Sequence, residues 1–361
     1  MKAAAVFPDK KSLGLVDNFP EPKLESRTGV KLRILNVGVC GTDREIASFA
    51  YGTPPEGSEY LVIGHECVGE IVEAGPEAVG VKPGDLAIPM VRRPCAHPEC
   101  AACRAGRSDF CYTGDYRERG IMKMHGFMTE FVVDEARYMN PVPAAIRDVA
   151  VLVEPLTIAE KSLIEVELIQ RRMPWRERLH AVVLGAGPVG LLGAMTLRNK
   201  GFDVTVYSRD REPNHSADTI RAIGGRYISS QDRSVDQMAA DVGPIDLVYE
   251  ATGVSPFAFE VLKALGPNGI FVLTGVPGHR PPIELDTDGL MRDLVLKNQC
   301  VLGTVNAGKD AFERAVADLA EFHAKWPAAV QGLITGRYPL EEFATPIRRQ
   351  TGIKNVIEIA K

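Results

Sequence analysis

The chain contains 361 residues, of which 45% are hydrophobic, and its formal net charge at pH 7 is −5. This length exceeds the size at which one hydrophobic core usually stops growing, so two domains are expected. Acidic and basic residues are interspersed, which excludes the basic stripe of a nucleic-acid-binding surface. The only apolar run near the start is too short for a signal peptide, and no run of about 18 apolar residues occurs. We therefore expect a cytoplasmic chain with no membrane partner.

The first part of the chain, to about Val153, consists of short apolar runs separated by Gly and Pro, which predicts a β-rich domain. The runs that predict strands lie at 31–41, 64–75, 85–91 and 128–134. Between residues 155 and 170 the apolar residues recur at helical spacing. This segment predicts a helix that links the two halves of the chain.

The second half alternates strands and helices. Residues 180–210 read as strand, glycine-rich turn, helix and strand, and continuous apolar runs follow at 245–252 and 269–275. Such runs are typical of strands buried on both faces of a parallel sheet. The pattern predicts an α/β fold with a doubly wound sheet, followed by a helix at 309–326 and a final strand at 355–360.

Four of the seven cysteines lie close together, separated by four, two and seven residues. They are Cys95, Cys100, Cys103 and Cys111. A reducing cytosol disfavours disulfides, whereas four thiolates complete a closed tetrahedron around a zinc ion. We expect a structural zinc site; free thiols in a loop are the alternative, and His97 could replace one of the sulfurs.

A dinucleotide fingerprint follows the strand at 181–184, because Gly185, Gly187 and Gly190 open the next helix. Its glycines allow a tight turn, close approach of a pyrophosphate and close packing of helix on strand. A purely structural glycine turn is the alternative.

The end of the following strand is basic. Ser208, Arg209 and Arg211 stand where an NAD site normally carries an acidic residue, and they suit the 2′-phosphate of NADP. Asp210 leaves room for use of NAD as well. The alternative is a solvated run of surface charges.

A second metal site is indicated by residues far apart in the sequence: Cys40, His65 with Glu66, and Glu154. One thiolate, one imidazole and one carboxylate leave a fourth position open, as catalytic zinc requires. Each residue alone also has a structural explanation, as a small core residue, a turn histidine or a carboxylate at a helix N-terminus.

Together these motifs resemble a known superfamily. "GHECVGEIVEAGPEA" resembles the zinc signature of medium-chain alcohol dehydrogenases, and the order of motifs matches over essentially the whole chain. Within that superfamily the chain is most similar to the archaeal-type zinc-dependent glucose 1-dehydrogenases, through "MVRRPC", "GRSDFCYTGDYRERGI", "KMHGFM", "EPLTIAEKS", "SRDREP" and "GTVNAG".

The resemblance implies a GroES-like catalytic domain at 1–155 with a zinc lobe at 95–111. A linker helix and a Rossmann nucleotide-binding domain at 156–304 follow, and 305–361 returns to the catalytic domain. It also implies two zinc ions per chain, NADP or NAD as cofactor, and a homo-oligomer, a dimer or a tetramer.

The resemblance also assigns roles to residues. Cys40 and His65 bind the catalytic zinc, Glu66 and Glu154 complete or flank its shell, and Thr42 lies beside the reacting oxygen. The residues expected to contact the sugar are Thr42, Glu118, Glu154 and Asn306. The residues expected to contact the cofactor are Gly185, Gly187, Pro188, Val189, Gly190, Ser208, Arg209, Arg211, Thr252, Gly253 and Asn306.

Three departures from the family pattern stand out. The first gap in the cysteine lobe has four residues where two is usual, Val91 replaces an Asn that contacts the sugar in some relatives, and Glu45 replaces a common relay histidine.

The implied reaction oxidises the C1 hydroxyl of D-glucose, with galactose and xylose as further aldose candidates. Zinc lowers the pKa of the hydroxyl, hydride passes from C1 to C4 of the nicotinamide, and water later opens the lactone. Two alternatives remain open at this stage. One is a dehydrogenase of another polyol, secondary alcohol or amino alcohol, and the other is a non-catalytic protein on the same fold.

Overall fold

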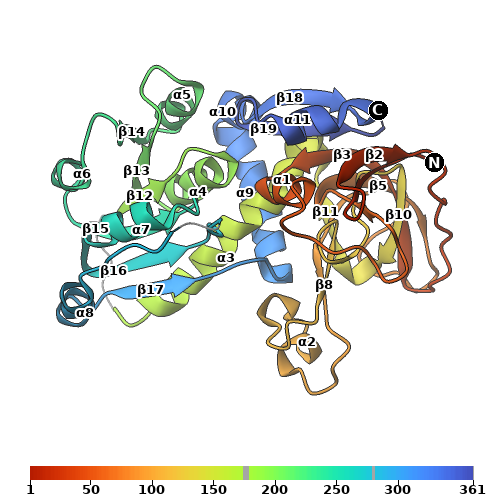
Figure 1. Ribbon diagram of the computed structural model, residues 1–361, viewed down its shortest axis with the longest axis horizontal. Coiled ribbons are helices and arrows are strands. Elements are labelled where there is room, and N and C mark those ends of the chain that lie inside the picture. Colours follow the sequence, from red (N-terminus) through yellow and green to blue (C-terminus); the bar gives the residue numbers. More distant parts are fainter. Residues whose placement is uncertain (174–178, 279–280, 361) are drawn as a thin grey trace. The chain divides into compact units, whose positions relative to one another are not determined.

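The computed structural model describes residues 1–173, 179–278 and 281–360, which form two compact units (Figure 1). Residues 174–178, 279–280 and Lys361, which the predicted segments 156–304 and 305–361 include, lie outside the described residues. The first unit consists of Met1–Thr157, Asn306–Ala324 and Val330–Lys361, and the second of Ile158–Val305 and Lys325–Ala329.

The first unit is built on a seven-stranded sheet centred on β3 (Gly29–Val39), in which most side chains are buried. Antiparallel pairing places β5 (Glu66–Ala74), β10 (Phe131–Glu135) and β19 (Lys354–Glu358) against β3. The remaining strands of the sheet are β6 (Leu86–Pro89), β11 (Met139–Val142) and β18 (Ile334–Pro339). The sheet therefore joins the returning tail to the N-terminal strands.

Two small sheets complete the strands of this unit. Their strands are β1 (Ala3–Phe7), β2 (Ser12–Val16) and β4 (Leu61–Val62), and β7 (Arg92–Arg93), β8 (Arg117–Arg119) and β9 (Lys123–Met124). The helices that lie wholly or mainly in it are α1 (Gly41–Ala47), α2 (Ala101–Arg104), α9 (Lys309–Lys325) and α11 (Ala344–Arg348). Its 3₁₀ helices are η1 (Ser108–Phe110), η2 (Ala136–Tyr138), η3 (Ala144–Leu152) and η4 (Leu340–Glu342).

The second unit contains a six-stranded parallel sheet in the order β14-β13-β12-β15-β16-β17. Numbered from its first strand this is 3-2-1-4-5-6, the order of dinucleotide-binding folds, so the predicted doubly wound sheet is confirmed. The strands are β12 (His180–Leu184), β13 (Asp203–Ser208), β14 (Arg226–Ser229), β15 (Ile245–Glu250), β16 (Leu265–Leu273) and β17 (Cys300–Gly303). Its helices are α4 (Pro188–Asn199), α5 (His215–Ala222), α6 (Val235–Val242), α7 (Ser255–Leu262) and α8 (Thr287–Leu296).

The helices α3 (Val153–Gln170) and α10 (Pro327–Gly332) each contribute residues to both units. The helix predicted at 155–170 begins two residues earlier, which puts Glu154 in its first turn. The helix predicted at 309–326 and the strand predicted at 355–360 are observed as α9 and β19, with ends shifted by one or two residues. None of the helices in the described part of the chain is long and apolar enough to cross a membrane.

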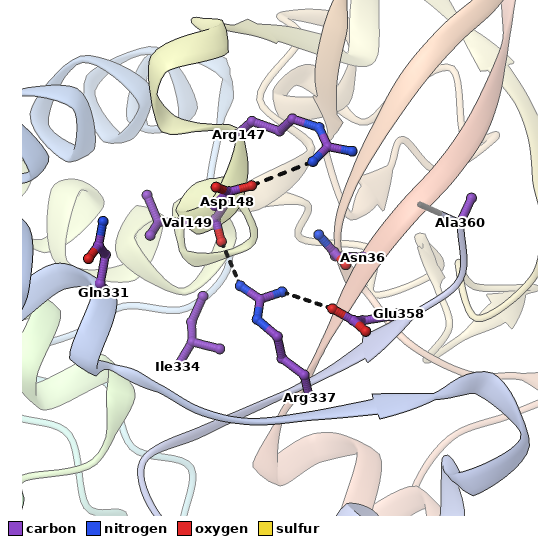
Figure 2. Close-up of a pocket in the computed structure, with 9 residues that line it drawn as sticks. All are labelled: Asn36, Arg147, Asp148, Val149, Gln331, Ile334, Arg337, Glu358 and Ala360. Carbon is purple, nitrogen blue, oxygen red and sulfur yellow. Dashed lines mark hydrogen bonds and ion pairs between the residues drawn. The ribbon is translucent and has the colours of Figure 1, made fainter.

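A pocket of about 590 Å³ lies in the first unit (Figure 2). Its charged lining residues largely pair with one another, since Arg337 lies 3.5 Å from Glu358 and donates to the Asp148 carbonyl at 2.9 Å. None of the site residues predicted from the sequence lines it. The lining residues are Asn36, Arg147, Asp148, Val149, Gln331, Ile334, Arg337, Glu358 and Ala360. This pocket is therefore not the candidate active site, although it is large.

Candidate active site

Cys40, His65 and Glu66 come together in the first unit, with one potential ligand atom from each within 4.8 Å of the others. The pairing of β3 with β5 explains this, because Gly38 is opposite Glu66 in the register. Cys40 follows β3 directly and His65 precedes β5. A Cβ at position 38 would overlap the Glu66 carboxylate, so a larger residue there would displace this side chain from the cluster.

Asp43 supports this cluster from the first turn of α1. Its side chain is fully buried, Oδ2 accepts a hydrogen bond from the Cys40 amide at 2.8 Å, and Oδ1 lies 3.5 Å from Nδ1 of His65. Burial acts to lower the pKa of His65, but Asp43 and Cys40 raise it well above its usual range. Asp43 therefore fixes the turn that carries Cys40 and places a carboxylate within ion-pair distance of the His65 ring.

Lys354 brings a buried positive charge to the same cluster. Its ammonium forms an ion pair with the Glu66 carboxylate and donates to the Val39 carbonyl at 3.2 Å. Both side chains are almost completely buried. Because an isolated buried charge is costly, the ion pair stabilises each partner and orients the Glu66 carboxylate.

Glu154 and Thr42 flank the cluster. Burial raises the pKa of Glu154 to about 7, and the charges of His65 and Glu66 also act on it. Its oxygens are nevertheless outside the group of ligand atoms within 4.8 Å of one another. The hydroxyl of Thr42 lies 3.9 Å from the Cys40 sulfur. The structure thus separates Glu154, beside the cluster, from the three residues that form it.

The donor set fits zinc. Ligands about 2.0–2.3 Å from a tetrahedral zinc ion lie roughly 3.3–3.8 Å apart, which the Cys40 cluster can reach with small side-chain movements. Thiolate, imidazole and carboxylate are all established zinc ligands, and three of them leave a fourth position open. The buried Asp43 beside the His65 ring is the outer-shell partner that ligating histidines normally have.

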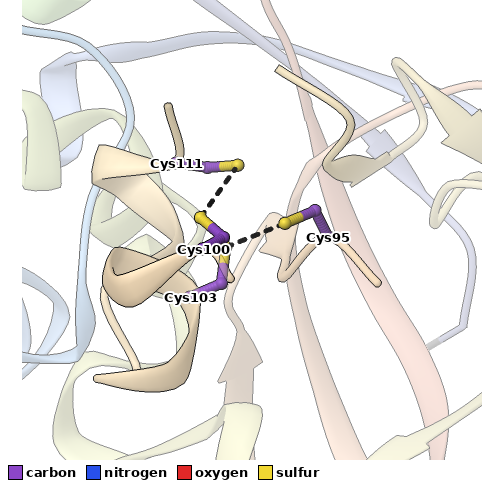
Figure 3. A group of neighbouring side chains, drawn as sticks. All are labelled: Cys95, Cys100, Cys103 and Cys111. Atoms are coloured by element: carbon purple, nitrogen blue, oxygen red, sulfur yellow. Dashed lines mark hydrogen bonds between the residues drawn. The ribbon is translucent and has the colours of Figure 1, made fainter. Parts of the chain in front are cut away.

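The four cysteines of the lobe form a second cluster (Figure 3). The Cys95 and Cys103 sulfurs are 3.6 Å apart and the Cys100 and Cys111 sulfurs 4.0 Å apart, close to the sulfur spacing around tetrahedral zinc. His97 instead lies 3.1 Å from Asp115. The residues present therefore fit a closed site made of four sulfurs.

The thiols of this cysteine cluster differ in pKa. Burial raises the pKa of Cys103 to about 12. For Cys111, burial acts in the same direction but hydrogen bonds with Thr113 outweigh it, and the pKa falls to about 6. The Cys111 thiol is therefore more readily deprotonated than that of Cys103.

Glu118 and Asn306, two of the four residues expected to contact a sugar, are hydrogen-bonded to each other. Nδ2 of Asn306 donates to Oε1 of Glu118 at 2.9 Å, and Oδ1 of Asn306 accepts from the Ala307 amide at 2.8 Å. The same Oε1 accepts from Nε of Arg92 at 2.9 Å. Two donors from different segments therefore fix one oxygen of the Glu118 carboxylate.

Two of the departures from the family pattern can be located. Val91 is 3% exposed and packs in the hydrophobic core of the unit, so its side chain cannot replace an amide in a polar site. Glu45 lies on α1 with its side chain exposed.

The glycine-rich turn in the second unit has the predicted geometry. β12 ends at Leu184, and Gly187 is the N-cap of α4, whose first residue is Pro188. A Cβ at Gly190 would overlap the Gly185 carbonyl oxygen, so only glycine allows helix and turn to pack this closely. The start of a helix after such a turn is a common binding site for phosphate groups.

The loop after β15 is held by a buried carboxylate that the sequence pattern did not reveal. Oε1 of Glu250 accepts from the amides of Thr252 at 2.7 Å and Gly253 at 2.8 Å, and Oε2 accepts from the Gly275 amide at 3.1 Å. Glu250 thus fixes the predicted cofactor residues Thr252 and Gly253.

The two arginines after β13 are exposed and differ in their partners. Arg209 is 82% exposed and lies 3.3 Å from the neighbouring Asp210, whereas Nε of Arg211 lies 2.8 Å from Asp232. Arg209 is therefore the less constrained of the two cations, and Arg211 already has a carboxylate partner.

Comparisons with known proteins agree with this arrangement. The alcohol dehydrogenase GroES-like domain model matches residues 26–144, and the glucose dehydrogenase C-terminus model matches residues 147–359. The glucose 1-dehydrogenase of Methanocella arvoryzae is 39% identical over 362 residues, covering 99% of each chain. That of Thermoproteus tenax is 40% identical, covering 95% of this chain and 94% of the relative.

This chain belongs to the glucose 1-dehydrogenase family of zinc-dependent medium-chain dehydrogenases. A solved glucose dehydrogenase of Haloferax mediterranei, in complex with NADP, Zn and gluconolactone, superposes with a TM-score of 0.90 at 32% identity, covering 100% of both chains. Galactitol-1-phosphate dehydrogenase from Escherichia coli has the same fold, with a TM-score of 0.81 at 20% identity. The predicted combination of GroES-like and Rossmann folds is confirmed.

Sequence reasoning missed four residues that hold predicted site residues in place: Asp43, Arg92, Glu250 and Lys354. Asp43 follows Cys40 by three residues, the spacing of a capping box, and this signal could have been used. Lys354 gave no local signal, because only the return of β19 to β3 brings it to Glu66. Arg92 likewise depends on the pairing of β7 with β8.

Proposed function

We propose that this chain is an NADP-dependent glucose 1-dehydrogenase that oxidises the C1 hydroxyl of D-glucose to the lactone. The observation that carries the proposal is the buried cluster of Cys40, His65 and Glu66 in a unit that also presents the Glu118–Asn306 pair. The relatives named glucose 1-dehydrogenase, which match along nearly the whole chain, supply the substrate class.

In the proposed site, Cys40, His65 and Glu66 hold the catalytic zinc, and Glu154 acts from beside it as an exchanging ligand or a sugar contact. Asp43 on the Nδ1 side of His65 would leave Nε2 free for the metal. When bound, zinc stabilises negative charge on the C1 oxygen, and NADP accepts the hydride. Thr42, beside Cys40, hydrogen-bonds the C1 oxygen. The hydroxyl proton passes to solvent, the C1–H bond breaks as a hydride, and its loss leaves a C1 carbonyl.

The sugar and the cofactor are bound by different sets of residues that share Asn306. Glu118 and Asn306 hydrogen-bond the sugar hydroxyls. The turn from Gly185 to Gly190 with Pro188 and Val189, together with Thr252 and Gly253, binds the dinucleotide, which Asn306 also contacts. Ser208, Arg209 and Arg211 bind the 2′-phosphate of NADP. The solved Haloferax mediterranei relative holds NADP, Zn and gluconolactone, which supports this assignment.

A spectrophotometric screen tests the proposal. Purified protein is assayed with glucose, galactose, xylose, polyols and amino alcohols, each with NADP and with NAD. We expect glucose or another aldose with NADP to give the highest kcat/KM. Turnover of a polyol or amino alcohol alone would move the enzyme to another alcohol-dehydrogenase class, and absence of both zinc and turnover would indicate a non-catalytic protein.

The cofactor preference has its own test. Replacing Arg209 and Arg211 with Ala removes charge-assisted hydrogen bonds that only NADP can use, so KM for NADP should rise about tenfold or more while KM for NAD changes little. Equal losses with both cofactors would show that the arginines only support the turn.

We further propose that the enzyme is a homo-oligomer. In the second unit, Met291, Val295 and Leu296 on α8 and Val301 on β17 are all at least 40% exposed, and β17 is an edge strand of the sheet. Exposed apolar patches of this kind commonly become interfaces. Light scattering coupled to size-exclusion chromatography tests this; a monomer at micromolar concentration would overturn it.

The proposed cellular location is the cytoplasm, where a reducing environment keeps the ligand thiols free to bind zinc. All seven cysteines are without disulfides in the structure. Recovery of the activity in a membrane or extracellular fraction of the source cells would contradict this location.

A further inference from the structure

The Glu118 carboxylate lies beside an arginine that no assignment of the site includes. Arg92 on β7 is opposite Glu118 on β8 in the antiparallel register, so their side chains emerge on the same face. Nε of Arg92 donates to Oε1 of Glu118 at 2.9 Å, and the two side chains are only 7% and 5% exposed. The ion pair is therefore buried and has a defined geometry.

Two further contacts hold the Arg92 guanidinium in place. Its Cζ lies 3.6 Å from the centre of the Tyr116 ring, which fixes the plane of the group. Nη1 makes a longer contact of 3.4 Å to the Asp109 carbonyl, on η1 of the cysteine lobe. Arg92 thus reaches from the lobe to the carboxylate, and its position does not depend on Glu118 alone.

The hydrogen bonds to Glu118 are unevenly distributed. Oε1 receives both Arg92 Nε and Asn306 Nδ2, whereas Oε2 accepts no hydrogen bond from the part of the chain that the structure describes. A carboxylate can accept on both oxygens. Arg92 and Asn306 therefore hold Oε1 and leave Oε2 to accept from a ligand.

The segment after β8 is joined to the loop that carries Tyr51. The Thr53 amide donates to the Ile121 carbonyl at 2.9 Å, which attaches the loop that carries Tyr51 to the segment after β8. Burial and then the Glu118 charge raise the pKa of Tyr51, whose side chain is 42% exposed. The carboxylate therefore acts on a side chain at the protein surface.

We propose that Arg92 is a positioning residue that sets sugar specificity: it fixes Oε1 of Glu118 so that Oε2 accepts from one defined sugar hydroxyl. This rests on the proposed oxidation of glucose. Lysine is a poor replacement, because a single ammonium cannot donate to Oε1, stack on Tyr116 and contact Asp109 in the same geometry.

The test compares Arg92→Lys with the matched control Arg117→Lys, an exposed arginine on the same strand as Glu118. We expect Arg92→Lys to raise KM for glucose about tenfold while kcat changes less than about threefold. KM for NADP, zinc content and the unfolding midpoint should stay near wild type, and Arg117→Lys should match wild type throughout.

The second arm measures specificity with 2-, 3- and 4-deoxyglucose. The wild-type enzyme should penalise at least one of them about tenfold, and Arg92→Lys should reduce that penalty towards one, since the free oxygen is no longer aligned. A double-mutant cycle with Glu118→Gln should be strongly non-additive, because Arg92 acts through Glu118. If Arg92→Lys does not fold, Tyr116→Leu, which removes the stacking partner, should give the same changes in smaller measure.

The outcomes separate the two claims. If wild-type enzyme does not oxidise glucose or another aldose, both the proposed function and this inference fail. If wild type oxidises glucose but Arg92→Lys keeps its KM and its deoxyglucose penalties, or if the cycle is additive, only the role of Arg92 is overturned. Equal rises in KM for glucose and NADP would also overturn it, as a general structural effect.

Discussion

The two clusters of potential metal ligands in the first unit are built in opposite ways. The cysteine cluster takes four identical ligands from residues 95–111, and its sulfurs already have the spacing of a zinc tetrahedron. The Cys40 cluster combines three kinds of ligand atom from the end of β3 and the start of β5. The buried charges of Asp43 and Lys354 lie against its ligands.

This difference suits the cysteine cluster to a role in stability and the Cys40 cluster to a role in catalysis. A closed site of four sulfurs has no coordination position for substrate, and it contributes folding free energy to the loop that carries it. A site with three protein ligands leaves room for a reacting oxygen but depends on the surrounding sheet for its geometry. Local sequence can therefore build the first kind of site, whereas the second requires the completed fold.

Substituting one ligand in each cluster should show the largest difference between the two clusters. Cys40→Ser should lower turnover about a thousandfold, which corresponds to about 4 kcal/mol of lost stabilisation of charge, with little change in the unfolding midpoint. Cys100→Ser should instead lower the unfolding midpoint, because structural zinc contributes to folding. Each variant should lose one zinc ion by elemental analysis, while Cys300→Ser, outside both clusters, should keep both ions.

Equal effects of Cys40→Ser and Cys100→Ser on turnover and on unfolding would contradict this division of roles.

Mild chelation should remove the two zinc ions in order. We expect fresh protein to contain two zinc ions per chain, and a chelator such as dipicolinate to take the ion at the Cys40 cluster first, since it has fewer protein ligands and an open position. Turnover should disappear while circular dichroism changes little, and added zinc should restore it. One zinc ion or none in fresh protein, or simultaneous loss of both, would disprove the contrast.

The Lys354–Glu66 ion pair should matter to the Cys40 cluster alone. Lys354→Met leaves Glu66 without its cation and should reduce turnover or zinc affinity about ten- to a hundredfold, as outer-shell substitutions typically do. Lys354→Arg, which keeps the charge, should retain most activity, and the ion at the cysteine cluster should be unaffected. Wild-type kinetics in Lys354→Met would show that Glu66 is oriented by the sheet alone.

The ligands of both clusters could be predicted from the sequence, but the buried residues that hold the ligands of the Cys40 cluster could not. Four closely spaced cysteines indicate a metal site without knowledge of the fold. Cys40, His65, Glu66 and Glu154 were grouped by their residue types and by resemblance to a family, since nothing in their spacing requires them to meet. The roles assigned to the individual site residues stay predictions until they are tested.

The Rossmann unit was the most predictable part, because buried parallel strands and the glycine turn leave strong local patterns. Lys354 and Asn306 reach the first unit's sites by long-range return of the chain, which local periodicity does not encode. The small strands β7 and β8, two and three residues long, are too short for an alternating pattern, so the Arg92–Glu118 pair could not be anticipated.

Glu118 lies between the two clusters in its contacts and its proposed role. Arg92 on β7 connects it to the cysteine lobe, whereas its proposed role is to bind the sugar that reacts at the Cys40 cluster. Glu118→Ala removes a carboxylate that accepts from the sugar, so kcat/KM for glucose should fall about tenfold or more, which corresponds to about 1.5–3 kcal/mol per hydrogen bond. Zinc content at both clusters should be unchanged. A small alcohol that cannot reach Glu118 should be affected much less, which separates lost sugar binding from a general disturbance. Unaltered glucose kinetics would remove Glu118 from the sugar site, whereas loss of zinc would make its carboxylate part of a metal site.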